Sequence, residues 1–403
     1  MRRRMTTGAI AIAVAVLALG VFAATGFGSS GPHSTALKKG TITVGYGNNL
    51  TGFLAAHDVL ISNGALLAVQ QINAKGGIGG KVKIKLMLRD VKSRPDTSVQ
   101  VARDLMNAKV NVLILPCNTD YQVAMAAVAN PRGQFMLSPC NGDPTVASKY
   151  GNYWPVGMAG NAQLAQLANY AKLRKIKKVY VLDAPQMLYV HLMAKYFKKA
   201  APSRGIQIVG SDDIPFGATG FPQDYSAIAT KIKNESNGAQ AIMTGLFSPF
   251  VDFLARDLRR AGVDIPVLGT DGMDTQLNLT TGKDAVNGYA FTTFGFPDKG
   301  SPTARFYAQF KGKFGASPDG TYPALGYDTI KVLEAAVIKS GGINGKVIQS
   351  ALANGMTVHG ALGRIRYKGS NQHNPVNIVA AVQIRNGKFV KALKGVPKKV
   401  PAP

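Results

Sequence analysis

The sequence predicts an α/β protein built from two doubly wound parallel sheets, one after the other along the chain. Short β-type apolar runs alternate with amphipathic helical segments from Gly40 onward. The alternation starts again at Lys177, after a break near Tyr153–Asn161. A chain of 403 residues is also long enough for two domains. Because alternating strands and helices fold into a parallel sheet covered on both faces, each half predicts one doubly wound unit.

In the first half, the expected strands are short apolar or alternating runs, which lie at Thr41–Tyr46, Val82–Asp90, Asn111–Pro116 and Gln134–Pro139. Apolar residues recur at helical spacing between Ile61 and Ile72, which predicts a helix after the first strand. We expect this helix to end at Asn73–Gly80, where glycines allow the left-handed conformation of a helix C-terminus.

In the second half, the same kind of run predicts strands at Lys177–Asp183, Ile206–Ile214, Ala239–Leu246, Ile265–Gly272 and Gly288–Phe296. A helix is expected over Pro323–Gly341. The segment Gly363–Val390 reads as a hairpin, and its strand content suits a return to the second domain.

The N-terminus has the composition of an export signal. Arg2, Arg3 and Arg4 precede an uncharged stretch that is apolar from Ala9 to Ala24 and rich in small residues up to Gly31. This order predicts a secretory signal over residues 1–30. The alternative is an uncleaved membrane anchor, because Gly8–Phe27 approaches the roughly 20 residues of a spanning helix. Either interpretation places the rest of the chain outside the cytoplasm, in the periplasm or at the cell surface.

The chain is strongly basic, with a formal net charge of +26. Its cations occur in several runs, among them Lys172–Lys178, Lys195–Lys199 and a basic tail over 396–403. Such runs are usually solvated helix faces or tails, and no nucleic-acid-binding motif accompanies them. We therefore expect no nucleic-acid partner, whereas association with an anionic membrane or cell-wall surface stays open.

The two cysteines of the sequence, Cys117 and Cys140, lie in the similar stretches LPCNTDYQ and LSPCNGDP. A catalytic nucleophile, a metal site, a disulfide and a pocket lining are all conceivable roles. The five histidines show no paired ligand spacing, so no metal or cofactor is expected. His57 is the one candidate base near these strand ends, and no cysteine-hydrolase signature is present, so no enzyme is expected. A disulfide and two buried thiols both remain open.

Polar residues follow both cysteines at the ends of successive predicted strands. Parallel sheets bind ligands at the carboxyl ends of their strands, where the following helices present free N–H groups. Asn118 and Thr119 open one such helix, and Asn141 and Gly142 follow the next strand. These N-termini favour anions, so a ligand carboxylate is one candidate occupant. The alternative is that the asparagines and Thr119 cap their own helices.

Several motifs in a fixed order carry a family resemblance. They are the two strands ending in polar clusters together with Leu50–Gly80, Phe253–Gly272, Gly326–Gly341 and His359–Gln372. With these, the chain resembles the type I periplasmic solute-binding proteins of ABC transporters, in the branched-chain amino acid and amide-binding branch typified by Leu/Ile/Val-binding proteins. The resemblance implies a monomer that closes two lobes on a small ligand and delivers it to separate permease and ATPase subunits.

The resemblance also implies a domain division with three hinge crossings. Lobe 1 is expected to comprise 40–158 and 295–362, and lobe 2 to comprise 159–294 and 363–395. The crossings are expected at Val156–Asn161, Thr292–Phe296 and Gly360–Tyr367. An alternative with the same fold is a membrane-anchored, ligand-sensing module, because fold alone does not decide function.

Further candidate ligand contacts come from the resemblance. Asp271 stands where the family commonly has an acidic residue that neutralises a ligand ammonium, and Phe247 stands where amino-acid binders often have Tyr. An offset of one residue leaves Met187, Leu188 or Tyr189 as a further site position. His57 is placed at the edge of the cleft, and Tyr46 near the end of the first strand is a similar candidate. Asn118 with the helix termini, and Asp271, would hold the two ends of a zwitterion, which predicts an amino acid or a related amine, amide or acid.

Overall fold

The structure is a computed structural model that describes residues 37–217, 220–369 and 373–403. The predicted signal or anchor, residues 1–30, lies outside the described residues. Within the described ranges, no helix is both long enough and apolar enough to cross a membrane.

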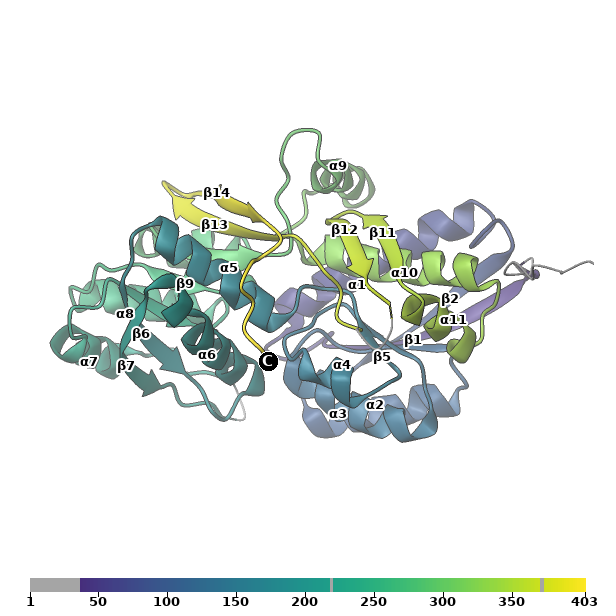
Figure 1. The fold of residues 1–403 in the computed structure, drawn as a ribbon, viewed down its shortest axis with the longest axis horizontal. Coiled ribbons are helices and arrows are strands. Elements are labelled where there is room, and N and C mark those ends of the chain that lie inside the picture. Colours follow the sequence, from purple (N-terminus) through teal and green to yellow (C-terminus); the bar gives the residue numbers. More distant parts are fainter. Residues whose placement is uncertain (1–36, 218–219, 370–372) are drawn as a thin grey trace, which may run out of the picture. The chain divides into compact units, whose positions relative to one another are not determined.

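The first sheet consists of parallel strands in the order β2-β1-β3-β4-β5 (Figure 1). Its strands are β1 (Gly40–Asn48), β2 (Val82–Asp90), β3 (Val112–Ile114), β4 (Met136–Ser138) and β5 (Tyr153–Pro155). The helices that follow them are α1 (Ala55–Ala74), α2 (Pro95–Asn107), α3 (Thr119–Ala129) and α4 (Thr145–Lys149). Apolar cores lie on both faces of this sheet, one under α1 and the other under α2 and α3, as expected for a doubly wound unit.

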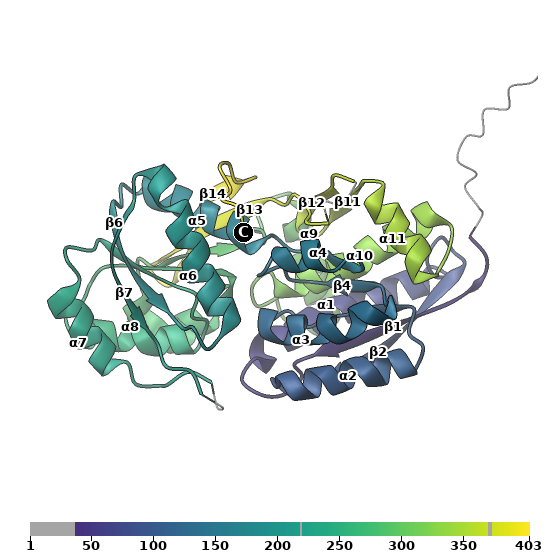
Figure 2. The same cartoon turned by 60° about the horizontal axis from the view of Figure 1, so that its bottom comes forward.

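The second sheet has the order β14-β13-β10-β9-β8-β6-β7; β13 pairs antiparallel with both β14 and β10, and the other neighbouring strands pair in parallel. Its strands are β6 (Lys178–Asp183), β7 (Gln207–Asp213), β8 (Ala241–Thr244), β9 (Val267–Gly269), β10 (Ala290–Thr293), β13 (Val379–Arg385) and β14 (Lys388–Gly395). The helices α5 (Gly160–Leu173) and α6 (Leu188–Ala200) cover one face, and α7 (Ser226–Glu235) and α8 (Phe250–Arg260) cover the other (Figure 2).

The remaining helices and a separate two-stranded sheet pack on the side of the first sheet. They are α9 (Pro302–Phe314), α10 (Tyr322–Ser340), α11 (Gly345–Ala353), β11 (Met356–Gly360) and β12 (Gly363–Tyr367). Short helical turns complete the structure at Asn130–Arg132, Pro202–Arg204, Asp271–Met273, Asn278–Gly282 and Lys283–Val286. We call the first sheet with the helices and hairpin packed on it lobe 1, and the second sheet with its helices lobe 2.

The C-terminal part differs from the expectation of one hairpin over Gly363–Val390. The strand β12 pairs with β11, and β13 pairs with β14, so there are two hairpins. Ile365 and Tyr367 are buried in the core of lobe 1, and the Tyr367 hydroxyl donates to the Pro155 carbonyl at 2.8 Å. The expected boundary at 362 falls in the turn between β11 and β12.

The helices α1 and α10 cross with their backbones in direct contact. An added Cβ at Gly64 would lie 1.7 Å from the Pro323 carbonyl oxygen, and one at Gly326 would lie 1.8 Å from the Ile61 carbonyl oxygen. Glycine is required at both positions because any side chain would force the helices apart. This close approach brings the start of α10, with Tyr322, next to the start of α1.

We predict that Gly64→Ala destabilises the protein, because one methyl group must separate two tightly packed helices. The expected loss in the free energy of unfolding is about 1–3 kcal/mol or more, measured by urea titration. Gly312→Ala is the matched control, because Gly312 lies within α9 and an added Cβ meets nothing within 4 Å. This control should gain about 0.5–1 kcal/mol from lower backbone entropy in the unfolded chain. Equal effects of the two substitutions would contradict the packing argument.

Candidate ligand-binding cleft

The carboxyl ends of strands from both sheets meet at one cavity. Its volume is about 40 Å³, taken as the space open to the centre of a water molecule. Lobe 1 contributes residues after β3 and β4 and the starts of α1 and α10, whereas lobe 2 contributes residues after β8 and β9 and the starts of α5 and α6. The lining comprises Leu54, His57, Asp58, Cys117, Asn118, Thr119, Cys140, Asn141, Gly142, Met158, Gln163, Tyr189, Phe247, Asp271, Gly272, Phe294 and Tyr322.

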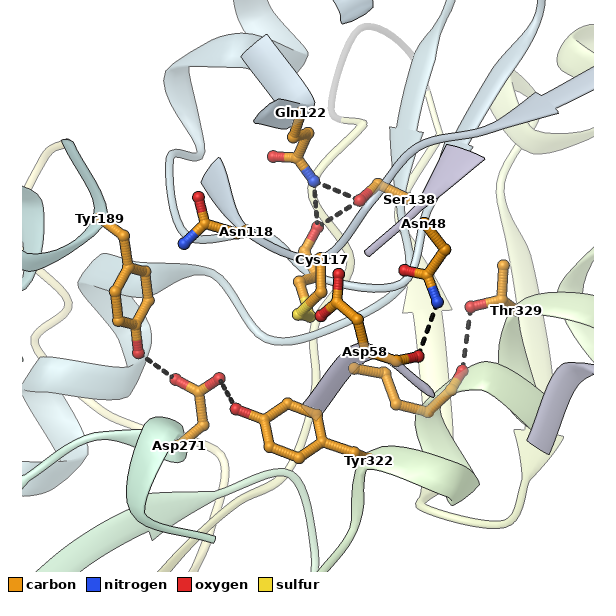
Figure 3. The surroundings of a disulfide bond; sticks show 12 residues. Asn48, Asp58, Cys117, Asn118, Gln122, Ser138, Tyr189, Asp271, Tyr322 and Thr329 are labelled. Carbon is orange, nitrogen blue, oxygen red and sulfur yellow. Dashed lines mark hydrogen bonds between the residues drawn. A yellow bond between two sulfur atoms is a disulfide. The ribbon is translucent and has the colours of Figure 1, made fainter. Parts of the chain in front are cut away.

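Cys117 and Cys140 form a disulfide that joins the ends of β3 and β4 (Figure 3). The Cys140 carbonyl accepts hydrogen bonds from Gln122 Nε2 at 3.1 Å and Ser138 Oγ at 2.9 Å. The bridge therefore fixes two chain segments that each present polar atoms to the cavity. With both cysteines in this bond, neither carries a thiol in this structure.

The polar residues that follow the two cysteines have two roles: one caps a helix, and others have buried polar atoms without a partner in the described part of the chain. Asn118 is the N-cap of α3, and its Oδ1 accepts from the Asp120 N–H at 3.0 Å. By contrast, Thr119 Oγ1 and Asn141 Oδ1 are buried without a hydrogen-bond partner among the described residues. An added Cβ at Gly142 would lie 2.2 Å from Thr119 Oγ1, so the glycine allows the two strand ends to touch. The unpaired atoms are available to a ligand.

Asp271 is an acid of the cavity whose carboxylate, among the described residues, is hydrogen-bonded by side chains alone. One carboxylate oxygen accepts from the Tyr189 hydroxyl at 2.7 Å and from Gln163 Nε2, and the other accepts from the Tyr322 hydroxyl at 3.1 Å (Figure 3). Burial, and then the Asp271 charge, hold the pKa of both tyrosines well above the ordinary value. Both hydroxyls therefore stay protonated donors at physiological pH. Tyr189 belongs to lobe 2 and Tyr322 to lobe 1, so the carboxylate binds donors from both lobes.

His57 provides a second contact between the lobes. Its Nε2 lies 3.3 Å from the Gly272 carbonyl oxygen, and its ring meets those of Phe247 and Tyr322 edge-on. Burial lowers the pKa of the imidazole, so the neutral form is favoured. Because Nε2 must carry the proton to donate to the carbonyl, Nδ1 is an acceptor, and it is buried without a partner among the described residues.

Asp58 is a cavity residue that sequence reasoning missed. It is 2% exposed, and burial raises its pKa to about 7 despite a 2.6 Å hydrogen bond from Asn49 Nδ2 and one from the Cys117 N–H. The sequence offered one indication of this residue, because Asp58 directly follows His57 near the start of a helix. The other missed lining residues are Leu54, Met158, Gln163, Gly272, Phe294 and Tyr322.

The predicted contacts His57, Asn118, Thr119, Asn141, Gly142, Tyr189, Phe247 and Asp271 are brought together in this lining. Met187 and Tyr46 are not. Met187 is 1% exposed, precedes α6 and packs in the core of lobe 2, so Tyr189 is the member of its triplet that lines the cavity. Tyr46 is 1% exposed in the core of lobe 1.

One more acid links the lobes beside the cavity. The Asp120 carboxylate accepts from the backbone N–H groups of Leu188 at 2.8 Å and Tyr189 at 3.2 Å. The helix α6 has no side-chain cap of its own, so Asp120 of lobe 1 caps a helix of lobe 2. Burial raises the pKa of this carboxyl, and the two backbone donors oppose that rise.

The lining contains acids but no Lys or Arg, and within the described chain no cluster of His, Cys, Asp and Glu could hold a metal ion. This set suits recognition of a small polar solute. A family model described as periplasmic binding protein matches residues 41–388. The chain belongs to this family.

Relatives and solved structures agree with that assignment. The Leu/Ile/Val-binding protein BraC3 of Rhizobium johnstonii is 27% identical over 82% of this chain and 88% of its own length. A leucine-, isoleucine-, valine-, threonine- and alanine-binding protein of Pseudomonas aeruginosa is 24% identical over 80% and 85%. A leucine-binding protein from Thermotoga maritima superposes with a TM-score of 0.79 at 23% identity, covering 88% of this chain and 99% of that one. A solute-binding protein of R. palustris in complex with benzoate gives a TM-score of 0.78 at 20% identity, covering 90% and 99%.

The predicted family and the predicted two-lobed α/β fold are thus confirmed. As a periplasmic binding protein, the chain belongs to a family of solute-binding proteins. The cavity lies where this fold class binds ligands, at the carboxyl ends of parallel strands.

We predict that replacing both cysteines by serine destabilises this periplasmic binding protein. The disulfide closes a loop with a sequence separation of 23 residues, so its loss should cost about 3 kcal/mol through greater freedom of the unfolded chain. Urea unfolding of wild type and double variant measures the difference. A reducing agent should lower the midpoint of the wild type and leave that of the variant unchanged. An equal response of both proteins would contradict this expectation.

We predict that Asp58 makes stability fall as the pH rises. The carboxyl has a pKa of about 7 when folded, against an ordinary value of 3.8, so between these values the folded state holds a proton that the unfolded state has lost. The free energy of unfolding therefore falls as the pH rises. This one group should remove about 2–3 kcal/mol of stability between about pH 5 and about pH 8.

Asp58→Asn removes that titration. As the pH rises from about 5 to about 8, the wild type should lose this stability and the variant should not. The difference between the two free energies of unfolding, measured by urea titration at each pH, should therefore shift in favour of the variant by about 2–3 kcal/mol. The exposed Asp284→Asn is the control for loss of one acidic side chain at the surface. A difference between Asp58→Asn and wild type that does not change with pH would show that the carboxyl does not gain a proton on folding.

Proposed function

We propose that this protein is the exported solute-binding component of an ABC importer, and that it captures an amino acid or a closely related amine by closure of its two lobes. Separate permease and ATPase subunits would receive the solute. The observation that carries the proposal is the buried Asp271 carboxylate, surrounded by neutral donors in a cavity without Lys or Arg. The amino-acid-binding names of the relatives support the same ligand class.

The carboxylate has a place for an ammonium group. Two carboxylate oxygens offer about four acceptor positions, and Tyr189, Gln163 and Tyr322 use three of them. An ammonium donating to the remaining position would add the full opposite charge that these neutral donors lack. His57 Nδ1 is an unpaired acceptor in the same lining and suits a second N–H of the ligand. A ligand without a donor-rich end would leave both groups unsatisfied.

The opposite wall suits a carboxylate. The start of α3 presents backbone N–H groups next to the unpaired Thr119 hydroxyl, and this hydroxyl can donate to an anion. The same lining contains the apolar side chains of Leu54, Met158, Phe247 and Phe294. This combination of an acceptor, an apolar lining and an anion-binding helix start suits an amino acid with an aliphatic or aromatic side chain.

Closure follows from contacts that only the closed cleft can make. A ligand ammonium held at Asp271 of lobe 2 also meets Tyr322 and His57 of lobe 1. In an open form, the ligand would contact one lobe and lose the groups of the other. The ligand therefore shifts the population toward closure by its difference in affinity for the two forms.

We predict that titration calorimetry with leucine, valine, alanine and threonine detects binding, whereas benzoate does not bind. Asp271→Asn should weaken the amine ligand by about 2–5 kcal/mol, because one partner of a desolvated charge pair is lost. The exposed Asp284→Asn serves as the control and should bind like wild type. Binding of benzoate without binding of any amine would refute the assignment of an ammonium to Asp271.

A further inference from the structure

Lobe 2 carries a concentrated basic surface, which we call the basic end. It consists of exposed cations in the turn from α5 to β6 together with two lysines at the end of α6, namely Lys172, Arg174, Lys175, Lys177, Lys178, Lys198 and Lys199. We propose that the basic end docks this protein on an anionic lipid bilayer. The proposal concerns a surface separate from the ligand cavity and does not depend on the identity of the solute.

Topology places these residues at one edge. The helices α5 and α6 pack side by side on the same face of the second sheet (Figure 2). Each helix runs opposite to the parallel strands, so both helices end where the strands begin. The Lys177 carbonyl accepts from the Gln207 N–H at 2.8 Å, which ties the start of β6 to the segment after α6. The cations of the turn and of α6 therefore share one edge.

Few acidic side chains lie near the cations of this edge. From residue 160 to residue 204 the sequence contains a single acid, Asp183, and it lies at the opposite end of β6 beside His191. In the described part of the chain, no Asp or Glu lies within salt-bridge distance of the basic end, and Lys199 Nζ donates to oxygens of Ala402 and Pro403 at 3.2 and 3.1 Å. Cations at helix C-termini are common because they interact with the helix dipole. Lys177 and Lys178 adjoin a strand instead, so the dipole does not explain them.

An apolar side chain at the centre of the cations favours a bilayer over a soluble polyanion. Leu173, between Lys172 and Arg174, is 58% exposed. A large apolar side chain flanked by cations is the composition that inserts at a membrane interface, where the cations meet the headgroups. A soluble anionic polymer or a nucleic acid would supply nothing to bury Leu173.

The C-terminal tail extends the same surface. Arg204 donates to the carbonyls of Lys398 and Lys399 at 2.6 and 2.9 Å, and also to Asn169 of α5 at 3.0 Å. These contacts hold two further exposed lysines against α5, and the tail exposes Val396 and Val400 by 45% and 41%. The predicted basic tail is thus ordered against lobe 2, next to the basic end.

Docking at this edge leaves the solute site open. The cavity lies at the carboxyl ends of the strands, and the basic end lies where β6 begins. The same protein can therefore sit on a membrane and exchange its ligand. Attachment through several cations without a spanning helix is reversible and sensitive to salt.

The test is co-sedimentation of the full chain with vesicles of equal parts phosphatidylglycerol and phosphatidylcholine, and with vesicles of phosphatidylcholine alone. We expect binding to the anionic vesicles and release on raising the ionic strength. Replacing Lys172, Lys177 and Lys178 by Gln should weaken binding on the order of a hundredfold, at about fivefold per cation. Leu173→Ser should weaken binding further, as measured at constant salt.

Matched controls separate a local surface from net charge. Replacing the exposed Lys39, Lys81 and Lys85 by Gln removes the same charge from the corresponding edge of lobe 1. Ile338→Ser removes an apolar side chain that is 53% exposed in α10. Both controls should bind within about twofold of wild type. Equal losses in the two triple variants, absence of binding to anionic vesicles, or tight binding to polyphosphate without vesicle binding would each overturn the proposal.

Discussion

A buried carboxylate that lacks a cation, Asp271, determines how the two lobes meet. Removing such a charge from water costs several kcal/mol unless hydrogen-bond donors replace the lost solvation. Lobe 2 supplies two donors, Tyr189 and Gln163, and lobe 1 supplies the third, Tyr322. Tyr322 reaches the carboxylate because α10 crosses α1 at glycines that allow backbone contact. The solvation of one acid is therefore coupled to helix packing in lobe 1 and to closure of the cleft.

Two further polar contacts cross the cleft near this acid. Asp120 of lobe 1 caps α6 of lobe 2, and His57 of lobe 1 lies against the Gly272 carbonyl. Each contact exchanges water for a protein partner, and such an exchange contributes about 1 kcal/mol net for a neutral pair and about 1.5–3 kcal/mol where one partner is charged. The closed form is therefore supported without being locked. The free-energy difference between the open and closed forms is then small enough for a bound ligand to set the population of the closed form.

The parts that sequence predicted are those set by local patterns. The strand Val82–Asp90 has the expected bounds, and the long helix after Thr321 differs from its predicted range by one residue at each end, because period-two and helical spacing are properties of the chain itself. Residues whose position depends on distant packing were missed, notably Asp58 and Tyr322. The same reason explains the β11–β12 hairpin, whose pairing is set by burial of Ile365 in lobe 1. Whether Cys117 and Cys140 join depended on the relative position of two strands, which no local pattern contains.

The distribution of charge favours one kind of solute in the proposed role. Outside the cavity the protein is strongly cationic, with 47 Lys and Arg against 21 Asp and Glu in the chain, whereas the cavity holds two acids and no Lys or Arg. A field of this sign slows the approach of a simple cation and attracts a simple anion, and the anion would then meet the carboxylate of Asp271. A zwitterion carries no net charge, so the outer field neither repels nor traps it. Its ammonium would pair with the Asp271 carboxylate at contact distance, where the attraction is strongest. A basic surface and an acidic cavity can therefore work together in one protein when the solute is a zwitterion, which has no net charge but carries both an ammonium and a carboxylate.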